Sequence, residues 1–413
     1  MTLFQIIALV LSLTAVFSYI NYRFIKLPIT IGVMLLSLVF SLILILLSNF
    51  GVNLHEKAET ILSQIDFNQT LMHGMLSFLL FAGALHVNIN DLRKQKWVIG
   101  TLATIGVITS TFLTGTAAYY ILNFLGIEIS YIYALIFGAL ISPTDPIAVL
   151  GILKLVGAPK TLETKITGES LFNDGVGVVV FIVLVGIATS GADISAASVV
   201  GLFATEALGG LFFGFGLGFI GYWMLKTIDN YQVEVLITLG LVTGGYALAG
   251  ALHLSAPIAI VVAGLMIGNH GRLFAMSDQT RKRLDNFWEL VDEILNAVLF
   301  LLIGLEVIIL TFTGQYLLAG VIMIFVVLLS RLISIGMPIQ ILKQFRDFTP
   351  YVVTIMTWGG LRGGISVALA LSLPAVPARE PILVITYCIV VFSILVQGLT
   401  VKKVLKLADR GDK

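Results

Sequence analysis

The chain has 413 residues, of which 58% are hydrophobic and only 11% are charged, and its mean hydropathy is +1.04. Because soluble domains carry roughly 25% charged residues, this composition excludes a soluble protein. It indicates an all-α polytopic membrane protein with a single membrane domain over residues 1–413. The net charge is only +1, and a single cysteine, Cys388, excludes an intrachain disulfide. We expect neither a cofactor nor a nucleic-acid partner.

Apolar runs long enough to cross a bilayer, about 20 residues each, predict about 13 transmembrane helices. They are expected near residues 3–20, 28–48, 70–88, 98–122, 131–153, 166–189, 197–225, 231–252, 255–268, 288–310, 316–340, 351–373 and 381–401. Arg23 and Lys26 follow the first run, and no basic leader precedes it. We therefore interpret this run as a retained helix and not as a signal peptide.

Basic residues predict how these spans are oriented. When alternate loops are assigned to one side, nearly all Lys and Arg residues outside the spans fall on the side that begins with residues 21–27. Only Lys57 and Arg379 fall on the other side. Since cytoplasmic loops carry such an excess of positive charge, we predict an outside N-terminus and a short cytoplasmic tail at residues 402–413. The expected location is the inner membrane of a bacterial or archaeal cell.

Two of the predicted spans are interrupted. The fifth contains Ser142-Pro143-Thr144-Asp145-Pro146, whose prolines break a helix, and the twelfth contains a glycine-rich run at 358–364. The two spans run in opposite directions, and such a pair is typical of transporters built as an inverted repeat. Irregular backbone at membrane depth is tolerated only where it is buried in protein or lines a cavity. We therefore expect two broken helices to cross beside the substrate site.

The sixth span brings further polar side chains to membrane depth. Ser170 and Asp174 share one helix face because they are four residues apart, and Glu169 and Asn173 share the neighbouring face. A carboxylate near the bilayer centre costs about 2.5–3.5 kcal/mol, which favours a functional over a structural role for Asp174 and Asp145. Two carboxylates close together in a low dielectric resist joint ionisation. Such a site holds a proton or a cation, which is the minimum that exchange requires.

Three further groups of charged residues need an interpretation. Arg331 lies inside the eleventh span, where a charge needs a partner, and we predict a structural ion pair with Glu169. Arg362 either serves the helix ends at the crossing or lines a polar funnel, and the sequence leaves both open. The acids at 289, 292 and 293 are expected at the start of the tenth span. A helix N-terminus favours acids there, and an ion entrance is the alternative.

Three strings carry a family resemblance: Ser-Pro-Thr-Asp-Pro at 142–146, Gly-Glu-Ser-Leu-Phe-Asn-Asp-Gly at 168–175 and Trp-Gly-Gly-Leu-Arg-Gly-Gly at 358–364. They resemble the signatures of the monovalent cation:proton antiporter family type one, and the likeness covers nearly the whole chain. It implies a homodimer of thirteen-helix protomers. The dimerisation scaffold would comprise spans 1–3 and 7–10, about residues 1–90 and 197–310. The ion-transporting core would comprise spans 4–6 and 11–13, about residues 98–189 and 316–401.

The resemblance also implies roles for individual residues. The Na⁺ ligands would be Asp174, Asp145, Ser170 and the backbone of Thr144, while Asn173 would orient the site and Glu169 would pair with Arg331. Some family members carry an acid in the third span, where this chain has Phe81. No ligand from the third span is therefore expected.

We expect the protein to be a secondary active antiporter, and not an enzyme, that exchanges Na⁺, or Li⁺ or K⁺, for H⁺ by alternating access. The predicted stoichiometry is electroneutral, one cation for one proton, because Asn173 stands where relatives that move two protons look as though they have an aspartate. The alternatives are a K⁺/H⁺ antiporter of the same fold, an ion channel, and an intramembrane aspartyl protease. The protease would need its second aspartate in a Gly-x-Gly-Asp string, whereas Asp174 follows Leu-Phe-Asn.

Overall fold

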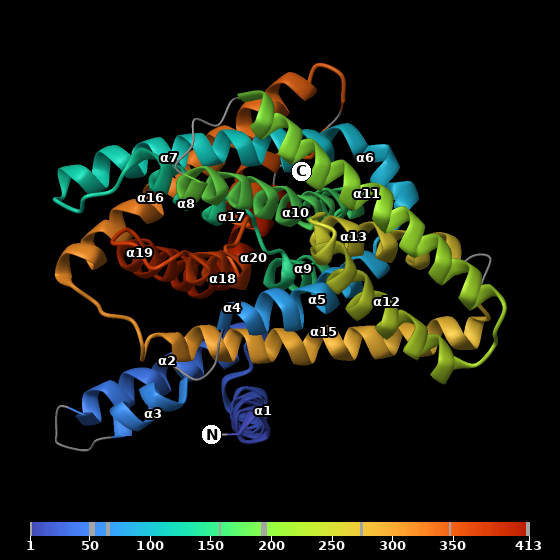
Figure 1. The fold of residues 1–413 in the computed structure, drawn as a ribbon, viewed down its shortest axis with the longest axis horizontal. Coiled ribbons are helices and arrows are strands. Elements are labelled where there is room, and N and C mark those ends of the chain that lie inside the picture. Colours follow the sequence, from blue (N-terminus) through green and yellow to red (C-terminus); the bar gives the residue numbers. More distant parts are fainter. Residues whose placement is uncertain are drawn as a thin grey trace.

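The computed structural model describes residues 2–48, 54–62, 67–156, 158–190, 196–272, 276–346 and 348–409, and it is helical almost throughout (Figure 1). Within these ranges, the β-type contact is one isolated antiparallel bridge between Asp145 and Leu361. In the same ranges, 8 helices are long and apolar enough to cross a membrane. Shorter apolar helices occur at Thr70–Leu85, Tyr131–Ile141 and Ala256–Gly271. The predicted fold class, an all-α polytopic membrane protein, is confirmed.

The helices occur in the following order, with η marking π-helical segments. They are α1 (Leu3–Ile20), η1 (Asn21–Ile25), α2 (Ile29–Ser48), α3 (Leu54–Leu62), α4 (Phe67–Gln69), η2 (Thr70–Met75), α5 (Leu76–Leu85), α6 (Ile89–Thr101), η3 (Leu102–Gly106), α7 (Val107–Phe124), α8 (Tyr131–Ile141), α9 (Ile147–Val156), α10 (Lys160–Ser190), α11 (Ala196–Lys226), α12 (Tyr231–Ala251), α13 (Ala256–Met266), η4 (Ile267–Gly271), α15 (Asp278–Glu306), α16 (Gly314–Leu342), α17 (Val352–Trp358), α18 (Gly364–Leu371), α19 (Arg379–Phe392), η5 (Ser393–Gln397) and α20 (Gly398–Asp409).

Each predicted span contains a helix or a broken pair of helices, but several boundaries differ. The largest difference is α15, which begins at Asp278 and not near 288. Its first turns are charged, so a search for apolar runs misses them, while Ser277 caps the true start by accepting a hydrogen bond from the backbone N–H of Thr280 at 3.3 Å. Helix α20 likewise continues to Asp409, into the segment predicted as a tail. Helix α3 was not predicted.

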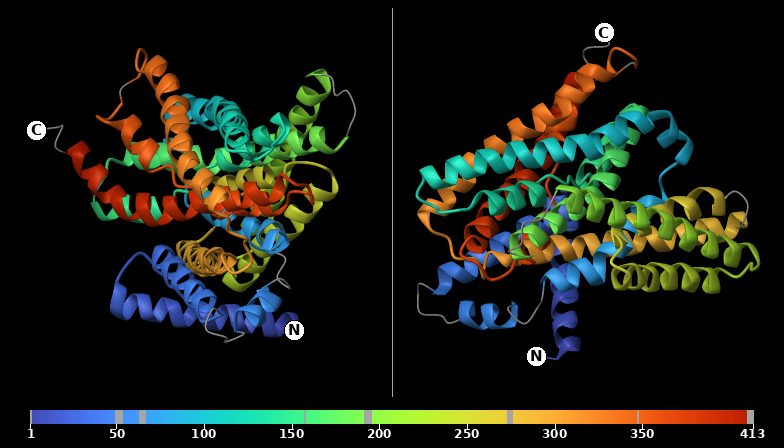
Figure 2. Two further views of the ribbon diagram at one scale, coloured as in Figure 1. Left: turned by 90° about the vertical axis from the view of Figure 1, so that its left-hand side faces the viewer. Right: turned by 45° about the horizontal axis from the view of Figure 1, so that its top comes forward.

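Helix α15 lies between α1 and α2 on one side and most of the remaining helices on the other, as Figures 1 and 2 show. It packs against α1 and α2 on one side and against α5 and α18 on the other, while α11, α12 and α13 pack together beside α5. Helices α7, α8, α10, α16 and α19 pack against one another in a separate group. A Cβ atom at Gly214 of α11 would lie 2.5 Å from the carbonyl oxygen of Ala259 on α13, so this glycine allows close helix packing.

The two interrupted spans meet at their breaks. Helices α8 and α9 are separated by residues 142–146, and α17 and α18 by residues 359–363. The backbone N–H of Asp145 donates to the carbonyl oxygen of Leu361 at 2.8 Å, which ties the two breaks together. The crossing of two broken helices is therefore as predicted, and it places four half-helix ends at one point.

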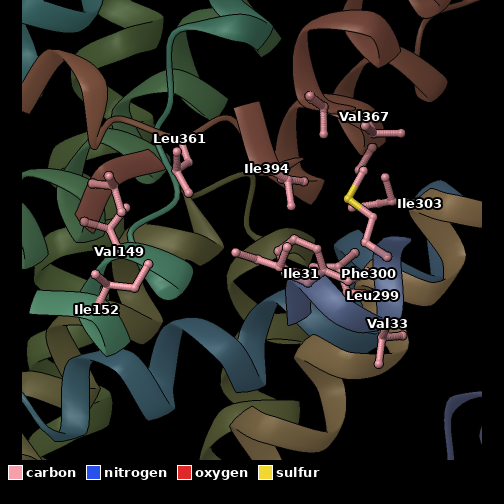
Figure 3. Close-up of a cluster of buried hydrophobic side chains, with 14 of the residues drawn as sticks. Ile31, Val33, Val149, Ile152, Leu299, Phe300, Ile303, Leu361, Val367 and Ile394 are labelled. Carbon is pink, nitrogen blue, oxygen red and sulfur yellow. The ribbon is translucent and has the colours of Figure 1, made fainter. Parts of the chain in front are cut away.

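Apolar side chains hold the crossing against the neighbouring helices (Figure 3). Leu361 lies near Val149 of α9, while Leu299 and Phe300 of α15 lie beside Ile31 of α2. All five side chains are at most 3% exposed. Because such a cluster is close-packed, it positions the polar backbone of the crossing without itself supplying polar atoms.

Candidate ion-binding site

Asp145 lies between the two halves of the broken fifth span. It precedes α9 and lies beside Gly363, the residue before α18, where a Cβ atom would come within 2.3 Å of the Asp145 carboxylate. Only glycine therefore fits at 363. Because helix N-termini carry partial positive charge, the start of α9 and the start of α18 both favour a negative charge here.

Arg362 serves the opposite ends of the half-helices. Its guanidinium donates to the carbonyl oxygens of Ser142 and of Pro143, the latter at 3.0 Å. These carbonyls follow the C-terminus of α8, where helix carbonyls lack intrahelical partners and attract cations. The side chain is only 2% exposed. Of the two roles that the sequence left open, the structure assigns Arg362 to the helix ends at the crossing.

Helix α10 brings its polar face against the first break. The hydroxyl of Ser170 donates to the carbonyl oxygen of Thr144, and Asp174 lies one turn further along the same face. A Cβ atom at Gly177 would lie 2.3 Å from the ring of Pro143, so this glycine lets α10 approach the broken segment. Ser170, Asp174 and the backbone of Thr144 are thus brought together with Asp145 around one cavity.

Asn173 is fully buried and is committed to its neighbours. Its amide donates to Thr144 Oγ1 at 2.9 Å and to Glu169 Oε1 at 3.2 Å, and its carbonyl oxygen accepts from the backbone N–H of Thr144 at 3.3 Å. Asn173 therefore holds Thr144 in place and links it to Glu169. This geometry makes it a positioning residue and not a ligand that faces the cavity.

Glu169 and Arg331 form a bidentate ion pair. Arg331 Nη1 donates to Glu169 Oε1 at 2.6 Å and Nη2 donates to Oε2 at 2.8 Å, while both side chains are almost fully buried. A Cβ atom at Gly360 would lie 2.7 Å from Arg331 Nε. A side chain at 360 or 363 would displace Arg331 or Asp145, so these two glycines give both residues room and also weaken the helix.

The site opens into a cavity of about 1030 Å³ between α5, η4 and α15 on one side and α9, α10 and α18 on the other. Ser170, Thr144, Asp145 and Asp174 line its deep end. Acids of α15 also line it, and they are Asp285, Glu289, Asp292 and Glu293. The acids at 289, 292 and 293 were predicted at the start of a span, with an ion entrance as the alternative. Because α15 starts at Asp278, they lie further inside the helix than predicted, and Asp285 is helical as well.

Phe81 makes no polar contribution to this cavity. Its side chain is fully buried, and its ring centroid lies 4.7 Å from that of Trp288 on α15. The third span therefore contributes an aromatic contact between α5 and α15 at the position where an acid was considered. The oxygen atoms around the deep end of the cavity belong to two carboxylates, a hydroxyl and a backbone carbonyl, which is a suitable set for an alkali cation.

Comparison with known proteins places this geometry among transporters. Residues 11–407 match the family described as "Sodium/hydrogen exchanger, transmembrane". The Na⁺/H⁺ antiporter NhaP of Pseudomonas aeruginosa is 54% identical over 402 residues, which are 96% of this chain and 95% of that protein. The Na⁺/H⁺ antiporter NhaH of Halobacillus dabanensis is 36% identical over 358 residues, with coverage of 85% and 86%. The sodium proton antiporter MjNhaP1 of Methanocaldococcus jannaschii, solved at pH 8, shares the fold with a TM-score of 0.75 at 19% identity, over 98% and 99% of the two chains.

Proposed function

The chain belongs to the sodium/hydrogen exchanger family, and from this premise we propose that it is a secondary active antiporter that exchanges Na⁺ for H⁺. The observation that carries this proposal is the meeting of Asp145, at the crossing of the broken helices, with Asp174 and Ser170 of α10 around one cavity. The names of the relatives favour Na⁺ over the K⁺/H⁺ and protease alternatives.

In the proposed cycle, the site formed by Asp174 and Asp145 holds either one Na⁺ or one proton, and the proton is carried by Asp174. The cation would be bound by both carboxylates, the Ser170 hydroxyl and the carbonyl oxygen of Thr144. In the structure Ser170 donates to that carbonyl, which leaves the lone pairs of the hydroxyl and a second lone pair of the carbonyl for the ion. Because two close carboxylates resist joint ionisation, loss of a proton and gain of Na⁺ are coupled.

The cavity indicates which side of the membrane the site faces. Besides the site residues it is lined by Asn88, Asp91, Lys160 and Arg272, which lie in loops predicted to be cytoplasmic. We propose that the structure is the inward-facing state, and that the N-terminus is outside and the C-terminus cytoplasmic. In alternating access, α10 and the crossing would move as a core against a scaffold containing α15, which in a homodimer would also join the two protomers.

A vesicle assay tests the exchange directly. The purified protein is reconstituted into vesicles with a trapped pH dye and an imposed pH gradient, and NaCl, LiCl or KCl is added in turn. We expect Na⁺ to dissipate the gradient. If none of the three cations moves protons, the proposed function is wrong, and a response to K⁺ alone would favour the K⁺/H⁺ alternative.

We further expect exchange to be electroneutral, one Na⁺ for one H⁺. Asn173 cannot titrate, and Glu169 is held in a bidentate ion pair with Arg331, so we expect no second proton from the neighbouring buried groups. Asp145 would remain in one ionisation state, because two helix N-termini favour its charge. The equilibrium pH gradient under Na⁺-driven exchange should therefore not change when valinomycin and K⁺ clamp the membrane potential. A dependence on potential, which acts with about 2.3 kcal/mol per charge per 100 mV, would contradict this stoichiometry.

A further inference from the structure

One face of α15 is directed at the crossing, and it carries Asp292, Asn296 and Leu299. Their spacing of four and three residues places them on one stripe of the helix. Asp292 and Leu299 both line the cavity, and the buried Asn296 lies between them on the same stripe. A Cβ atom at Gly364 would lie 2.6 Å from Leu299 Cδ1. The stripe therefore ends against the start of α18, at the level of the proposed ion site.

Asn296 is a buried amide without a hydrogen-bond partner. Its side chain is 1% exposed, and neither Nδ2 nor Oδ1 has a partner of normal geometry among the residues that the structure describes. Its NH₂ group lies close enough to the Asp292 carboxylate, one turn earlier on the helix, to interact weakly with it. A buried polar group left unsatisfied costs about 1–3 kcal/mol. Asparagine is thus a poor choice for packing at this position, and its Oδ1 is available to a ligand.

Asp292 provides negative charge next to that amide. It is partly exposed to the cavity, and in the described part of the chain no basic group lies within ion-pair distance of its carboxylate. Asp285, two turns earlier, is by contrast paired with Arg272. The carboxylates of Asp292 and Asp145 line the same cavity, where like charges repel each other. A cation between the two carboxylates would relieve this repulsion.

We propose that Asp292 and Asn296 form a second monovalent-cation site on α15, which holds Na⁺ on the way from the cytoplasmic mouth of the cavity to Asp145 and Asp174. The Asp292 carboxylate and Asn296 Oδ1 are its protein ligands, and cavity water completes the coordination. The inference rests on the proposed function, which identifies the ion. Helix α15 packs against α1 and α2 and belongs to the proposed scaffold, whereas Asp174 lies on α10 in the proposed moving core. The ion would therefore pass from the scaffold to the core before transport.

Equilibrium binding of ²²Na⁺ to the full-length protein tests this site. In an Asp145→Asn/Asp174→Asn background, which removes both carboxylates of the first site, we expect Na⁺ binding to persist. Adding Asp292→Asn should weaken the remaining binding at least about tenfold, equivalent to about 1.4 kcal/mol. The matched control is Glu293→Gln, which removes the same charge from an exposed neighbour lining the same cavity. It should change binding by less than about twofold, as a screened, exposed charge does.

Two outcomes of this experiment would overturn the second site. One is the absence of Na⁺ binding in the Asp145→Asn/Asp174→Asn background while the unaltered protein still exchanges Na⁺ for H⁺. The other is equal weakening by Asp292→Asn and Glu293→Gln, because this would show only the general field of an acidic cavity. If the unaltered protein neither binds Na⁺ nor exchanges it, the proposed function fails as well, so the two failures are distinguishable.

Asn296→Leu provides a second test that does not depend on removing a charge. Leucine is similar in size and leaves no unsatisfied amide, so the thermal unfolding midpoint should stay the same or rise. The remaining Na⁺ binding should nevertheless weaken at least about threefold, by less than the tenfold that corresponds to 1.4 kcal/mol. Unchanged Na⁺ binding, or a lowered unfolding midpoint that accompanies the loss of binding, would identify Asn296 as a packing residue and overturn its role as a ligand.

Discussion

Asp174→Asn and Asp145→Asn are each expected to reduce Na⁺/H⁺ exchange to the background rate of empty vesicles, while the protein still folds. Asparagine keeps the shape of the side chain but loses the negative charge and the ability to carry a proton. Asp174 shares its helix face with Ser170, and Asp145 lies at the crossing of the broken helices, so neither charge has a substitute at the deep end of the cavity. The measurement is Na⁺-driven movement of protons in reconstituted vesicles.

Glu163→Gln is the matched control for Asp174→Asn. Glu163 lies on the same helix and lines the same cavity nearer its mouth, so its replacement removes one negative charge without touching the proposed site. Exchange should remain within about twofold of the unaltered protein, because a charge near solvent is screened. Near-native exchange by Asp174→Asn, or equal losses in Asp174→Asn and Glu163→Gln, would remove Asp174 from the site.

Breaking the Glu169–Arg331 pair is expected to lower the free energy of unfolding by about 3–5 kcal/mol, whichever partner is changed to alanine. The pair is bidentate and buried, with N–O distances of 2.6 and 2.8 Å. Each single substitution leaves the other charge buried without its partner. The double variant should recover part of the loss, because no uncompensated charge then remains.

The measurement is a double-mutant cycle of unfolding in detergent. Lys160 and Asp91 supply the matched control, since their ion pair at 2.9 Å lies at the surface, with the lysine side chain 76% exposed. That pair should contribute no more than about 1 kcal/mol. Additive losses for Glu169→Ala and Arg331→Ala would show that the two residues do not stabilise each other. Because Asn173 donates to Glu169, Glu169→Ala should also slow exchange.

Hydropathy and charge alone determined the class of protein and most of the helices. Apolar runs and the distribution of Lys and Arg reflect the free energy of moving residues from water into lipid. For each segment this free energy depends mainly on its own residues and little on the rest of the fold. Prolines and glycines likewise break a helix locally, so both interruptions could be predicted from residues 142–146 and 358–364. The polar stripe of Ser170 and Asp174 followed from helix periodicity.

Contacts between distant segments were decided by the tertiary structure alone. The sequence allows two roles for Arg362, and the structure places its guanidinium at the end of α8. Gly360 and Gly363 leave room for the side chains of Arg331 and Asp145. The acids at 289, 292 and 293 were predicted at the start of a helix. The charged turns of α15 that precede them, from Asp278 onward, contain too few apolar residues to be recognised as part of an apolar run. Only packing, which depends on shape and on neighbours far apart in the sequence, brought Asp292 to the cavity beside the crossing, with Asn296 buried one turn further along α15.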